Sequence, residues 1–316
     1  MLGATIVENQ ATAIPPVYDY RETMVTSQKV NWKIEDIIGG DKKLDFSKRF
    51  MPESLARVEE LSFLNNDEKR VLNQVRGNTY LGIFGLVEEF ILPFVLDHVR
   101  PNLGDDDYRV RAFLQFAGEE AKHIQLFKIF AEEFRKDFGT ECKLIGPPAD
   151  VASEILSHDP LGVALAILLI EWMSQRHYID SIKDDNQIDD QFKSLLKNHW
   201  LEEAQHAKLD TRMVEDLAVG LSNEEIEKGV DEFLAIGGFL DEGLKQQTLF
   251  DLEAFEAATG RVLNEAERKE FLAKQLQANR WTYIGTGMTH PKFLEMLEKL
   301  DPRQRERIEE VAPAFC

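Results

Sequence analysis

The sequence reads GEEAKH at residues 118–123 and HWLEEAQH at residues 199–206. Both stretches contain Glu-x-x-His, and the second has a further histidine one turn upstream. Residues three and four apart share one face of an α-helix, so each stretch directs its side chains toward one point: Glu120 with His123, and His199 with Glu203 and His206. Clustered carboxylates and imidazoles bind metal ions. In helical bundles, two such helices and one Glu from each of two further helices form a dinuclear iron or manganese site.

Four long helices are expected around these motifs. Apolar periodicity, capping residues and terminating glycines place them at residues 67–99, 106–138, 159–182 and 188–218. Leu81–Leu96 is apolar nearly all round, which is typical of a buried helix, and Asp105–Asp107 is expected to cap the second helix. The connection inside each pair is short, whereas about twenty residues join the two pairs. Two antiparallel hairpins joined by one long crossover form the connectivity of a ferritin-like four-helix bundle.

The remaining segments predict an all-α chain in three parts. Residues 1–50 contain paired prolines and glycines among scattered charges, and we expect an extended N-terminal arm that wraps the domain. Residues 51–220 are expected to form the di-metal bundle. Residues 221–316 are expected to form a C-terminal helical extension packed on the bundle, because further helix starts follow: Ser222 with Glu225, Asn264 with Glu267, and Asp301-Pro302.

Composition limits the partners and the compartment. The formal net charge is -20 and the sequence pI is about 4.8, which argues against nucleic acid or an anionic membrane surface as a partner. The longest apolar run, Leu161–Ile170, is too short to span a bilayer. The two cysteines form no disulfide framework, and Met1–Glu8 has no secretory pattern. We therefore expect a soluble, cytoplasmic protein.

Buried carboxylates are the candidate ligands on the other two helices. Glu171 follows a run of aliphatic residues, where a carboxylate is costly unless it is protonated, paired with an arginine or bound to a cation. Only cation binding also explains the inward glutamates of the other helices. On the first helix the choice is between Glu88 and Glu89. Measured from Asp97 on the solvated side, Glu88 lies about 180° round the helix and Glu89 about 80°, so Glu88 is preferred.

The positions next to the motifs are assigned by the same helical phase. Glu119 is expected to face outward, because its neighbour Glu120 occupies the inner face. His199 lies in line with the second motif and is therefore a candidate ligand. Asp210, one turn after that motif, could orient an imidazole or be an ordinary solvated residue, and both interpretations stay open. The remaining histidines do not fit the site by distance, phase or position: His98, His158, His177 and His290.

These residues resemble the ferritin-like di-iron carboxylate superfamily over residues 70–218. Within it, the run from His199 to His206 resembles the arylamine N-oxygenases, typified by p-aminobenzoate N-oxygenase, which add a third histidine to four carboxylates and two histidines. The resemblance implies seven metal ligands: Glu88, Glu120, His123, Glu171, His199, Glu203 and His206. It also implies two iron ions as the cofactor, with manganese as an alternative, O₂ as a co-substrate and an external electron donor.

Related families fit the sequence less well. The radical-bearing subunit of class I ribonucleotide reductase usually has a tyrosine four residues after the first motif histidine, where this chain has Phe127. Acyl-carrier-protein desaturases usually lack a histidine at the position of His199. The arylamine N-oxygenases have no counterpart that can be matched to the segments before residue 50 and after residue 220, so the substrate is not indicated.

The sequence and its resemblance together predict a non-haem di-iron oxygenase. The expected reaction is oxidation of a small organic substrate, either N-oxygenation of an amine or hydroxylation, with an electron-donor protein or another reductant as partner. Related bundles often pair, so a homodimer is one expectation. The alternatives are a ferroxidase or iron-handling protein without an organic substrate, an acyl desaturase-like oxidase, and a metal-free bundle with buried ion pairs.

Overall fold

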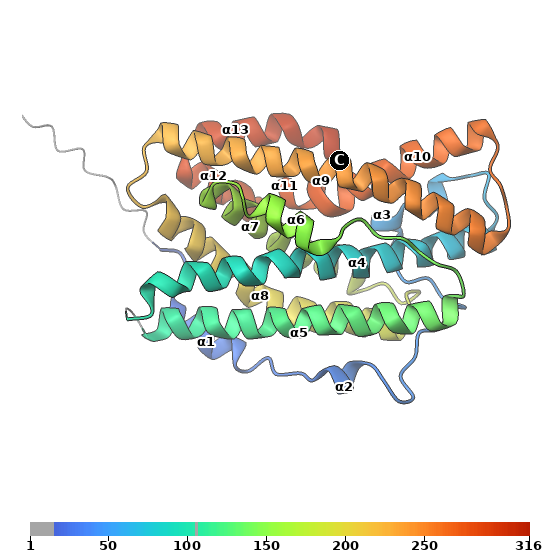
Figure 1. Cartoon of the computed structure of the whole chain (residues 1–316), viewed down its shortest axis with the longest axis horizontal. Helices are drawn as coiled ribbons and strands as arrows, with labels where there is room; N and C mark the ends of the chain where they lie inside the picture. The colour runs from blue at the N-terminus through green and yellow to red at the C-terminus, as the bar shows by residue number, and fades with distance from the viewer. Residues whose placement is uncertain (1–15, 105–106) are drawn as a thin grey trace, which may run out of the picture.

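Four helices form a central bundle in the computed structural model, which describes residues 16–104 and 107–316. They are α4 (Asn66–Val99), α5 (Asp107–Phe138), α7 (Pro160–Arg176) and α8 (Asp190–Ala218). Helix α4 packs on α5, α7 packs on α8, and α5 also contacts α8. A long crossover containing α6 (Pro148–Ile155) joins the two pairs (Figure 1). The described residues therefore have the all-α, ferritin-like connectivity expected from the sequence.

The helix ends follow the expected capping chemistry. Asp159 accepts a hydrogen bond from the backbone N–H of Leu161 at 3.0 Å and caps α7, which begins at Pro160. Ser222 forms a reciprocal capping box with Glu225 at the start of the next long helix. The cap expected from Asp105–Asp107 lies outside the described residues and side chains, as does the segment Met1–Glu8.

Helix α4 lies in the core of the bundle. Part of the stretch from Asn66 to Asn102 is long and apolar enough to cross a membrane, but 61% of that apolar window is buried inside this protein. The buried side chains include Phe84 and Phe90, which are at most 1% exposed. A mostly buried helix of this kind is typical of the core of a soluble bundle. The cytoplasmic location stays a prediction.

Further helices cover the bundle on two sides (Figure 1). On one side, α1 (Tyr20–Ser27) lies against both α5 and α8, and α2 (Ile34–Ile37) contacts α8. On the other side, α9 (Asn223–Thr259) packs on α7 and α4. The segment before the bundle is thus partly helical rather than simply extended, because Asp19 caps a short helix. The other elements are α3 (Glu53–Ala56), η1 (Val58–Glu60), η2 (Arg100–Asn102), η3 (His177–Ile182), α10 (Glu265–Arg280), η4 (Trp281–Gly285), α11 (Thr286–Met288), α12 (Pro291–Leu300), α13 (Pro302–Val311) and η5 (Ala312–Phe315).

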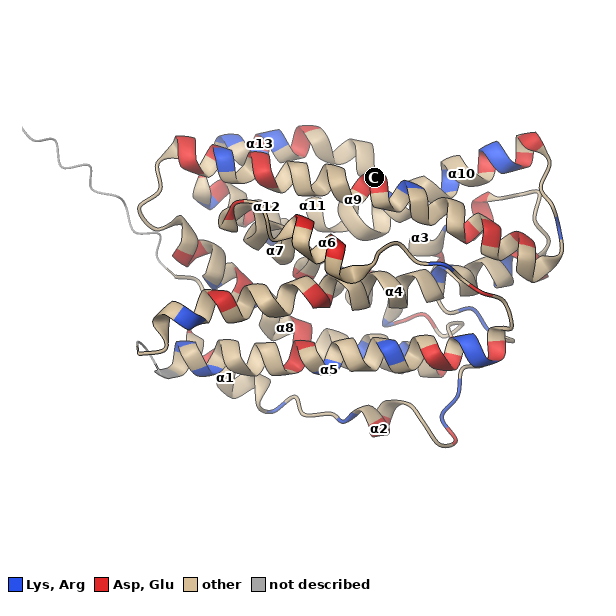
Figure 2. Ribbon diagram, viewed as in Figure 1, with Lys and Arg blue, Asp and Glu red and all other residues tan. Residues whose placement is uncertain are grey.

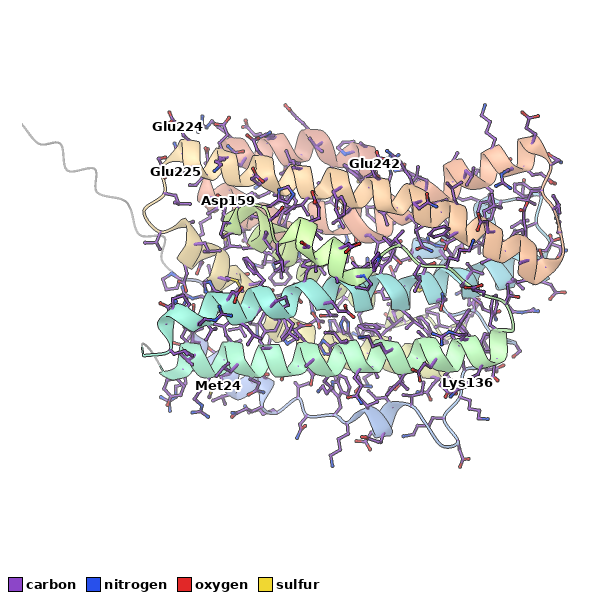
Figure 3. All side chains as sticks on the ribbon, in the orientation of Figure 1. Met24, Lys136, Asp159, Glu224, Glu225 and Glu242 are labelled. Carbon is purple, nitrogen blue, oxygen red and sulfur yellow. The ribbon has the colours of Figure 1, made fainter. Side chains whose placement is uncertain are left out.

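A close backbone approach joins α7 to α9. A Cβ atom added to Gly162 would lie 3.0 Å from the carbonyl oxygen of Gly229, so only glycine allows this spacing. Asp159 is labelled in Figure 3. Its carboxylate lies 3.8 Å from the Lys228 ammonium near the start of α9. These contacts hold the C-terminal helices on the bundle. The division into three domains itself stays a prediction.

Charged residues of both signs alternate over the helices, and acidic positions also occur in the middle of α5 and α8 (Figure 2). Most ion pairs are at the surface, such as that between Lys136 and Glu133. Surface pairs of this kind contribute little to stability. The acidic positions inside the bundle are different, because a carboxylate removed from water requires a partner. They form the cluster described next.

Candidate metal centre

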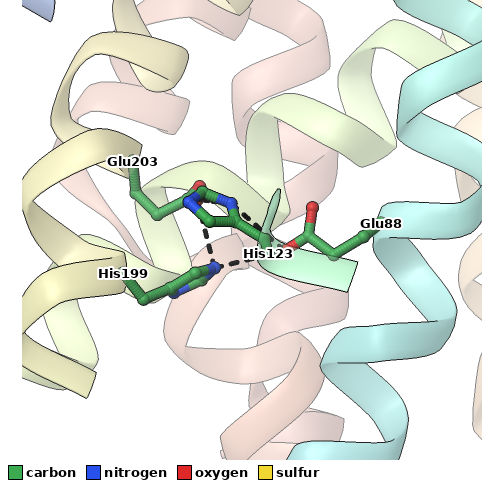
Figure 4. Close-up of side chains that lie close together, drawn as sticks. All are labelled: Glu88, His123, His199 and Glu203. Carbon is green, nitrogen blue, oxygen red and sulfur yellow. Dashed lines mark hydrogen bonds and ion pairs between the residues drawn. The ribbon is translucent and has the colours of Figure 1, made fainter. Parts of the chain in front are cut away.

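Carboxylate and imidazole groups from three bundle helices meet in the interior, at the middle of the bundle. In Figure 4, Glu88 of α4, His123 of α5, and His199 and Glu203 of α8 point toward one another. His199 Nε2 lies 3.2 Å from Glu88 Oε1 and 3.1 Å from Glu203 Oε1. All four residues are at most 3% exposed. Glu89 instead faces outward and pairs with Lys128 at 2.9 Å, so the helical phase argument gave the correct orientation for both glutamates.

A second group overlaps the first. It consists of Glu120, His123, Glu203 and His206, and one ligand atom from each lies within 4.8 Å of the others. His206 Nδ1 is 2.8 Å from Glu120 Oε1, and His123 Nδ1 is 3.0 Å from Glu203 Oε1. His123 and Glu203 belong to both groups, but the one inward nitrogen of His123 can bind a single ion, whereas the two carboxylate oxygens of Glu203 could serve two. The geometry therefore fits two cations side by side rather than two separate sites.

These inward atoms are close without forming hydrogen bonds to each other. Neither the Nδ1 atoms of His123 and His206 nor the facing oxygens of Glu120 and Glu203 have a hydrogen-bond partner among the described residues. Buried polar atoms are nearly always hydrogen-bonded, so such orphans call for an explanation. Ligand atoms that converge at ion-pair distance without hydrogen-bond geometry fit the coordination of an ion between them, and mixed carboxylate and imidazole ligands suit iron or manganese.

Two outer glutamates hold the imidazoles in place, and each comes from the opposite helix. His123 Nε2 of α5 lies 2.8 Å from Glu202 Oε2 of α8. His206 Nε2 of α8 lies 2.9 Å from Glu119 Oε2 of α5. The first glutamate of each motif thus holds the histidine of the other motif. The expectation that Glu119 faces outward is wrong, because α8 and α1 pack over that side of α5 and leave the residue only 8% exposed.

The partners of the outer glutamates determine which imidazole nitrogen carries the proton. Glu202 also accepts a hydrogen bond from Lys122 Nζ at 2.5 Å. Glu119 also accepts from Ser27 Oγ at 2.7 Å and from Gln115 Nε2 at 3.1 Å. Both carboxylates therefore act as acceptors, so the Nε2 atoms of the histidines donate, and the Nδ1 atoms face inward. This arrangement of carboxylate and histidine is the usual support for an imidazole that binds a metal.

The pKa shifts indicate that the cluster balances its carboxylates with protons. Burial alone would lower the pKa of His123 and of His206, but the surrounding carboxylates outweigh it and hold both pKa values well above the ordinary one. Burial, reinforced by the charge of Glu203, raises the pKa of Glu171 well above its usual range. Protons thus occupy the places where cations would neutralise the same groups. Metal ligands have to be deprotonated, so a bound cation would replace these protons.

Glu171 and Asp210 complete the buried acidic groups. Glu171 of α7 is 1% exposed, and its Oε2 has no hydrogen-bond partner among the described residues. Asp210 of α8 is 1% exposed and both of its oxygens lack a partner, so it is not a solvated residue. It does not hold the distal nitrogen of His206 either, because Glu119 occupies that position. Burial raises the pKa of Asp210 well above its usual range.

The segment before the bundle closes the site from outside. The Trp32 ring lies parallel to the His123 ring, with 5.9 Å between centroids and 9° between planes. The Lys122 ammonium sits 3.8 Å from the centroid of Trp32. Trp32 is 8% exposed and so excludes water from the outer face of the imidazole. Sequence periodicity could not reveal this role, because it depends on a contact between segments about 90 residues apart.

The four remaining histidines lie outside the cluster, as expected. His98 contacts Arg109 at 2.8 Å, and His158 contacts Glu232 at 2.5 Å. His290 stacks on Trp172. His177 is buried and has two hydrogen-bond partners of its own. None of them contributes to either of the two ligand groups.

An apolar cavity lies beside the cluster. Its lining comes from α4, α7, α9, η4 and Ile145 of the crossover, and includes Ile83, Phe84, Val87, Ile170, Leu240 and Tyr283. Phe84 meets the His199 ring edge-on at 5.5 Å between centroids, which connects the cavity wall to the cluster. A larger surface cleft lies near Tyr20, His98 and Asp216, but none of the cluster residues lines it. The apolar cavity is therefore next to the cluster, but its volume of about 30 Å³ is room for about one water molecule, so these side chains would have to move apart to admit an organic substrate.

Comparisons with known proteins give a distant structural similarity only. No family model matches the chain, and no curated protein matches it. Solved structures with a similar fold include variants of an R2-like ligand-binding oxidase. One with an aerobically reconstituted Mn/Fe cofactor is 12% identical, covers 83% of this chain and 92% of its own, and has a TM-score of 0.43. Another with an Fe/Fe cofactor is 14% identical, covers 83% and 92%, and has a TM-score of 0.40. These similarities are too distant to transfer a residue, cofactor or activity to this chain.

Proposed function

We propose that this chain is a non-haem oxygenase that binds two adjacent iron or manganese ions and uses O₂ to oxidise a small organic substrate. The observation that carries the proposal is the pair of overlapping ligand groups that share His123 and Glu203. The seven proposed ligands are Glu88, Glu120, His123, Glu171, His199, Glu203 and His206. Their four carboxylates carry four negative charges when deprotonated, which two divalent cations would neutralise inside the apolar core.

The protein's own groups would prepare this site before any ion binds. Glu202 and Glu119 hold the two imidazoles by Nε2, so that each Nδ1 faces inward and offers its lone pair once a cation displaces its proton. Burial lowers the pKa of His199 to about 4, so this third histidine is neutral at pH 7 and also offers a lone pair. Trp32 keeps water from the outer side. Two bound ferrous ions would supply electrons that reduce O₂, which is chemistry that amino-acid side chains lack.

The apolar side chains next to the cluster favour an organic substrate over hydrated iron, and their cavity of about 30 Å³ would have to widen to hold one. A ferroxidase requires a path for hydrated iron, whereas the cavity next to the cluster is lined by groups such as Ile83, Val87 and Ile170, which do not bind ions. The third histidine, His199, supports an amine as substrate through the resemblance to the arylamine N-oxygenases. We therefore propose N-oxygenation of an amine or hydroxylation, with electrons from a donor protein or another reductant. A homodimer and a cytoplasmic location remain part of this proposal.

Metal loading and oxygen uptake test the proposal together. The purified protein is loaded with ferrous iron under argon, freed of excess metal, and mixed with O₂ in the presence and absence of a reductant. We expect two ions per chain and rapid oxidation that leads to repeated turnover only with reductant and a substrate amine. Fewer than about one ion per chain would remove the proposal, given the affinity that buried mixed-ligand sites reach. Repeated iron oxidation without reductant would instead identify a ferroxidase.

A further inference from the structure

Tyr80 and His177 form a buried hydrogen-bonded pair close to the metal centre. The Tyr80 hydroxyl lies 3.0 Å from His177 Nδ1. The two residues are 2% and 1% exposed. Tyr80 belongs to α4, and His177 opens the π-helical turn η3, a geometry that often occurs at functional sites. Neither residue is needed to build the two ligand groups.

Thr286 determines which nitrogen of His177 carries the proton. Its hydroxyl lies 3.0 Å from His177 Nε2 and donates its own hydrogen to the carbonyl oxygen of Thr282, 3.0 Å away. A hydroxyl has one hydrogen, so toward His177 it can only accept, and Nε2 is the N–H. Nδ1 therefore has the lone pair and accepts the hydrogen of Tyr80. Burial lowers the pKa of His177 to about 3, so the ring is a neutral base at pH 7.

Two aromatic contacts connect Tyr80 to the ligand groups. The rings of Tyr80 and Phe84 are stacked, with 4.3 Å between centroids. Phe84 then meets the ring of His199 edge-on, with 5.5 Å between centroids and 90° between planes. Burial raises the pKa of Tyr80 well above its ordinary value, and the charges of Tyr283 and Glu203 add to this effect. Tyr80 is thus a protonated phenol within a short electron-transfer distance of the site.

We propose that Tyr80 and His177 form a redox-active pair that exchanges one electron with the metal centre. The proposal rests on the proposed function, because the oxidant is a metal ion that has been oxidised by O₂. One electron passes from the Tyr80 phenol to that ion, which is reduced by one unit. The phenol O–H bond breaks, and its proton forms an N–H bond at His177 Nδ1. The products are a neutral tyrosyl radical and an imidazolium, and return of the electron and proton restores both residues.

The proton acceptor makes this step feasible inside the protein. Removing an electron alone would leave a charged phenol radical in an apolar environment, which is costly. An oxidised phenol is a far stronger acid than an imidazolium, so the proton moves along the existing 3.0 Å hydrogen bond as the electron leaves. The positive charge then rests on His177, whose Nε2 remains bonded to Thr286. The pair therefore holds one oxidising equivalent on residues that are not metal ligands.

Tyr283 provides a matched control. Its ring centroid lies 6.2 Å from that of Tyr80, and it is 7% exposed. Its hydroxyl has no hydrogen-bond partner among the described residues, so no base is in position to take its proton. Oxidation of Tyr283 is therefore unfavourable although the residue is nearly as buried as Tyr80 and its ring lies beside that of Tyr80. Replacing it by phenylalanine should leave the radical unchanged.

The test combines the metal-loaded and the metal-free protein. Ferrous-loaded samples are mixed with O₂ and freeze-quenched, and metal content, iron oxidation and the EPR spectrum are recorded on the same samples. We expect a radical signal that narrows with ring-deuterated tyrosine in the wild type and in Tyr283→Phe, and that is lost in Tyr80→Phe. His177→Gln, which removes the base, should lower the radical yield by roughly 100-fold, the effect of removing a positioned proton acceptor.

The metal-free proteins give an independent measurement. Azide radicals from a radiolysis pulse oxidise the protein, and the phenoxyl absorbance is followed in time. A long-lived fraction is expected in the wild type and in Tyr283→Phe but not in Tyr80→Phe. Bound, oxidised iron with no tyrosine signal, or a signal that persists in Tyr80→Phe, would overturn the pair and leave the proposed function intact. Absence of bound iron would overturn the proposed function, and equal phenoxyl decay in wild type and Tyr80→Phe would then also overturn the pair.

Discussion

Replacing Glu202 by glutamine should weaken metal binding although Glu202 is not one of the proposed ligands. Glu202 is fully buried and accepts from Lys122 on one oxygen and from His123 Nε2 on the other. A glutamine amide has one oxygen and one NH₂ group, so in either orientation its NH₂ meets a donor. If it faces His123, the imidazole proton shifts to Nδ1 and blocks the lone pair that points inward. If it faces Lys122, an ammonium is left without its acceptor.

The expected loss follows from the role of such supporting groups. Loss of an outer partner of a metal-binding histidine typically costs about 10- to 100-fold in metal affinity. This corresponds to about 1.4 to 2.8 kcal/mol of binding free energy. We expect the loss of metal affinity in Glu202→Gln to be near the upper end of this range. Glu119→Gln should be near the lower end, because the Ser27 hydroxyl can rotate and accept from the new amide.

A competition titration measures this effect. Ferrous or manganous ions are distributed between the protein and a coloured chelator under argon, and the dissociation constants are compared with that of Glu89→Gln. This control makes the same chemical change one position from a proposed ligand, but at a partly exposed carboxylate that pairs with Lys128. Its effect should be within twofold of the wild type, as is usual for a surface ion pair. If Glu202→Gln binds metal as tightly as Glu89→Gln, the supporting role assigned to Glu202 and Glu119 is wrong.

Three further predictions concern the cluster and its surroundings. His199→Ala should lower the metal content or alter the oxygen chemistry, and unchanged values for both would exclude His199 as a ligand. Metal binding in weak buffer should release about two to three protons per chain, because the raised pKa values of His123, His206 and Glu171 have to be overcome; a pH indicator that detects no release would contradict this. His177 has a pKa of about 3 in the folded protein, below its ordinary value of about 6.5. As the pH falls below about 6.5, the unfolded chain therefore binds a proton at this residue before the folded protein does, and the folded protein loses stability. The free energy of unfolding of the metal-free protein, measured in urea, should therefore fall by about 1.4 kcal/mol more per pH unit between about pH 6 and 4 than that of His177→Gln. Parallel pH profiles for the two proteins would refute the assignment.

The fold was largely predictable because its signals are local. Apolar periodicity, the cap at Asp159 and the capping box at Ser222 each act within a few residues, and they placed the four bundle helices correctly to within a few positions. The short helix in the segment before the bundle was missed, because proline- and glycine-containing stretches carry no periodicity. The crossover helix α6 (Pro148–Ile155) was missed for the same reason.

The orientations of the inner residues were also predictable, but those of the outer ones were not. Helical phase correctly turned Glu88 inward and Glu89 outward, since α4 has one clear solvated side. The same argument failed at Glu119, because it treats the space beyond the helix as solvent and ignores the neighbouring helix. A signal was nevertheless present in the sequence. Both motifs read Glu-Glu-Ala-x-His, and the first glutamate of each motif, at 119 and 202, supports the histidine of the other.

The contacts of Trp32 and the pair of Tyr80 and His177 depend on tertiary packing alone. Helical phase excludes His177 from the site, and the structure places it outside both ligand groups, but phase on one helix cannot reveal a partner on another. Its partners come from α4 and from Thr286 in the C-terminal part of the chain. Such pairings join residues about 100 positions apart, and a single sequence without homologues contains no signal for them.

The number and spacing of bound ions test the central claim most directly. The protein is loaded with manganous ions, its metal content is determined, and its EPR spectrum is recorded at low temperature. We predict two ions per chain whose spectrum is that of an exchange-coupled pair, because the two ligand groups overlap and the Glu203 carboxylate belongs to both. A single ion per chain with the six-line spectrum of isolated manganese, or no retained metal, would contradict the account.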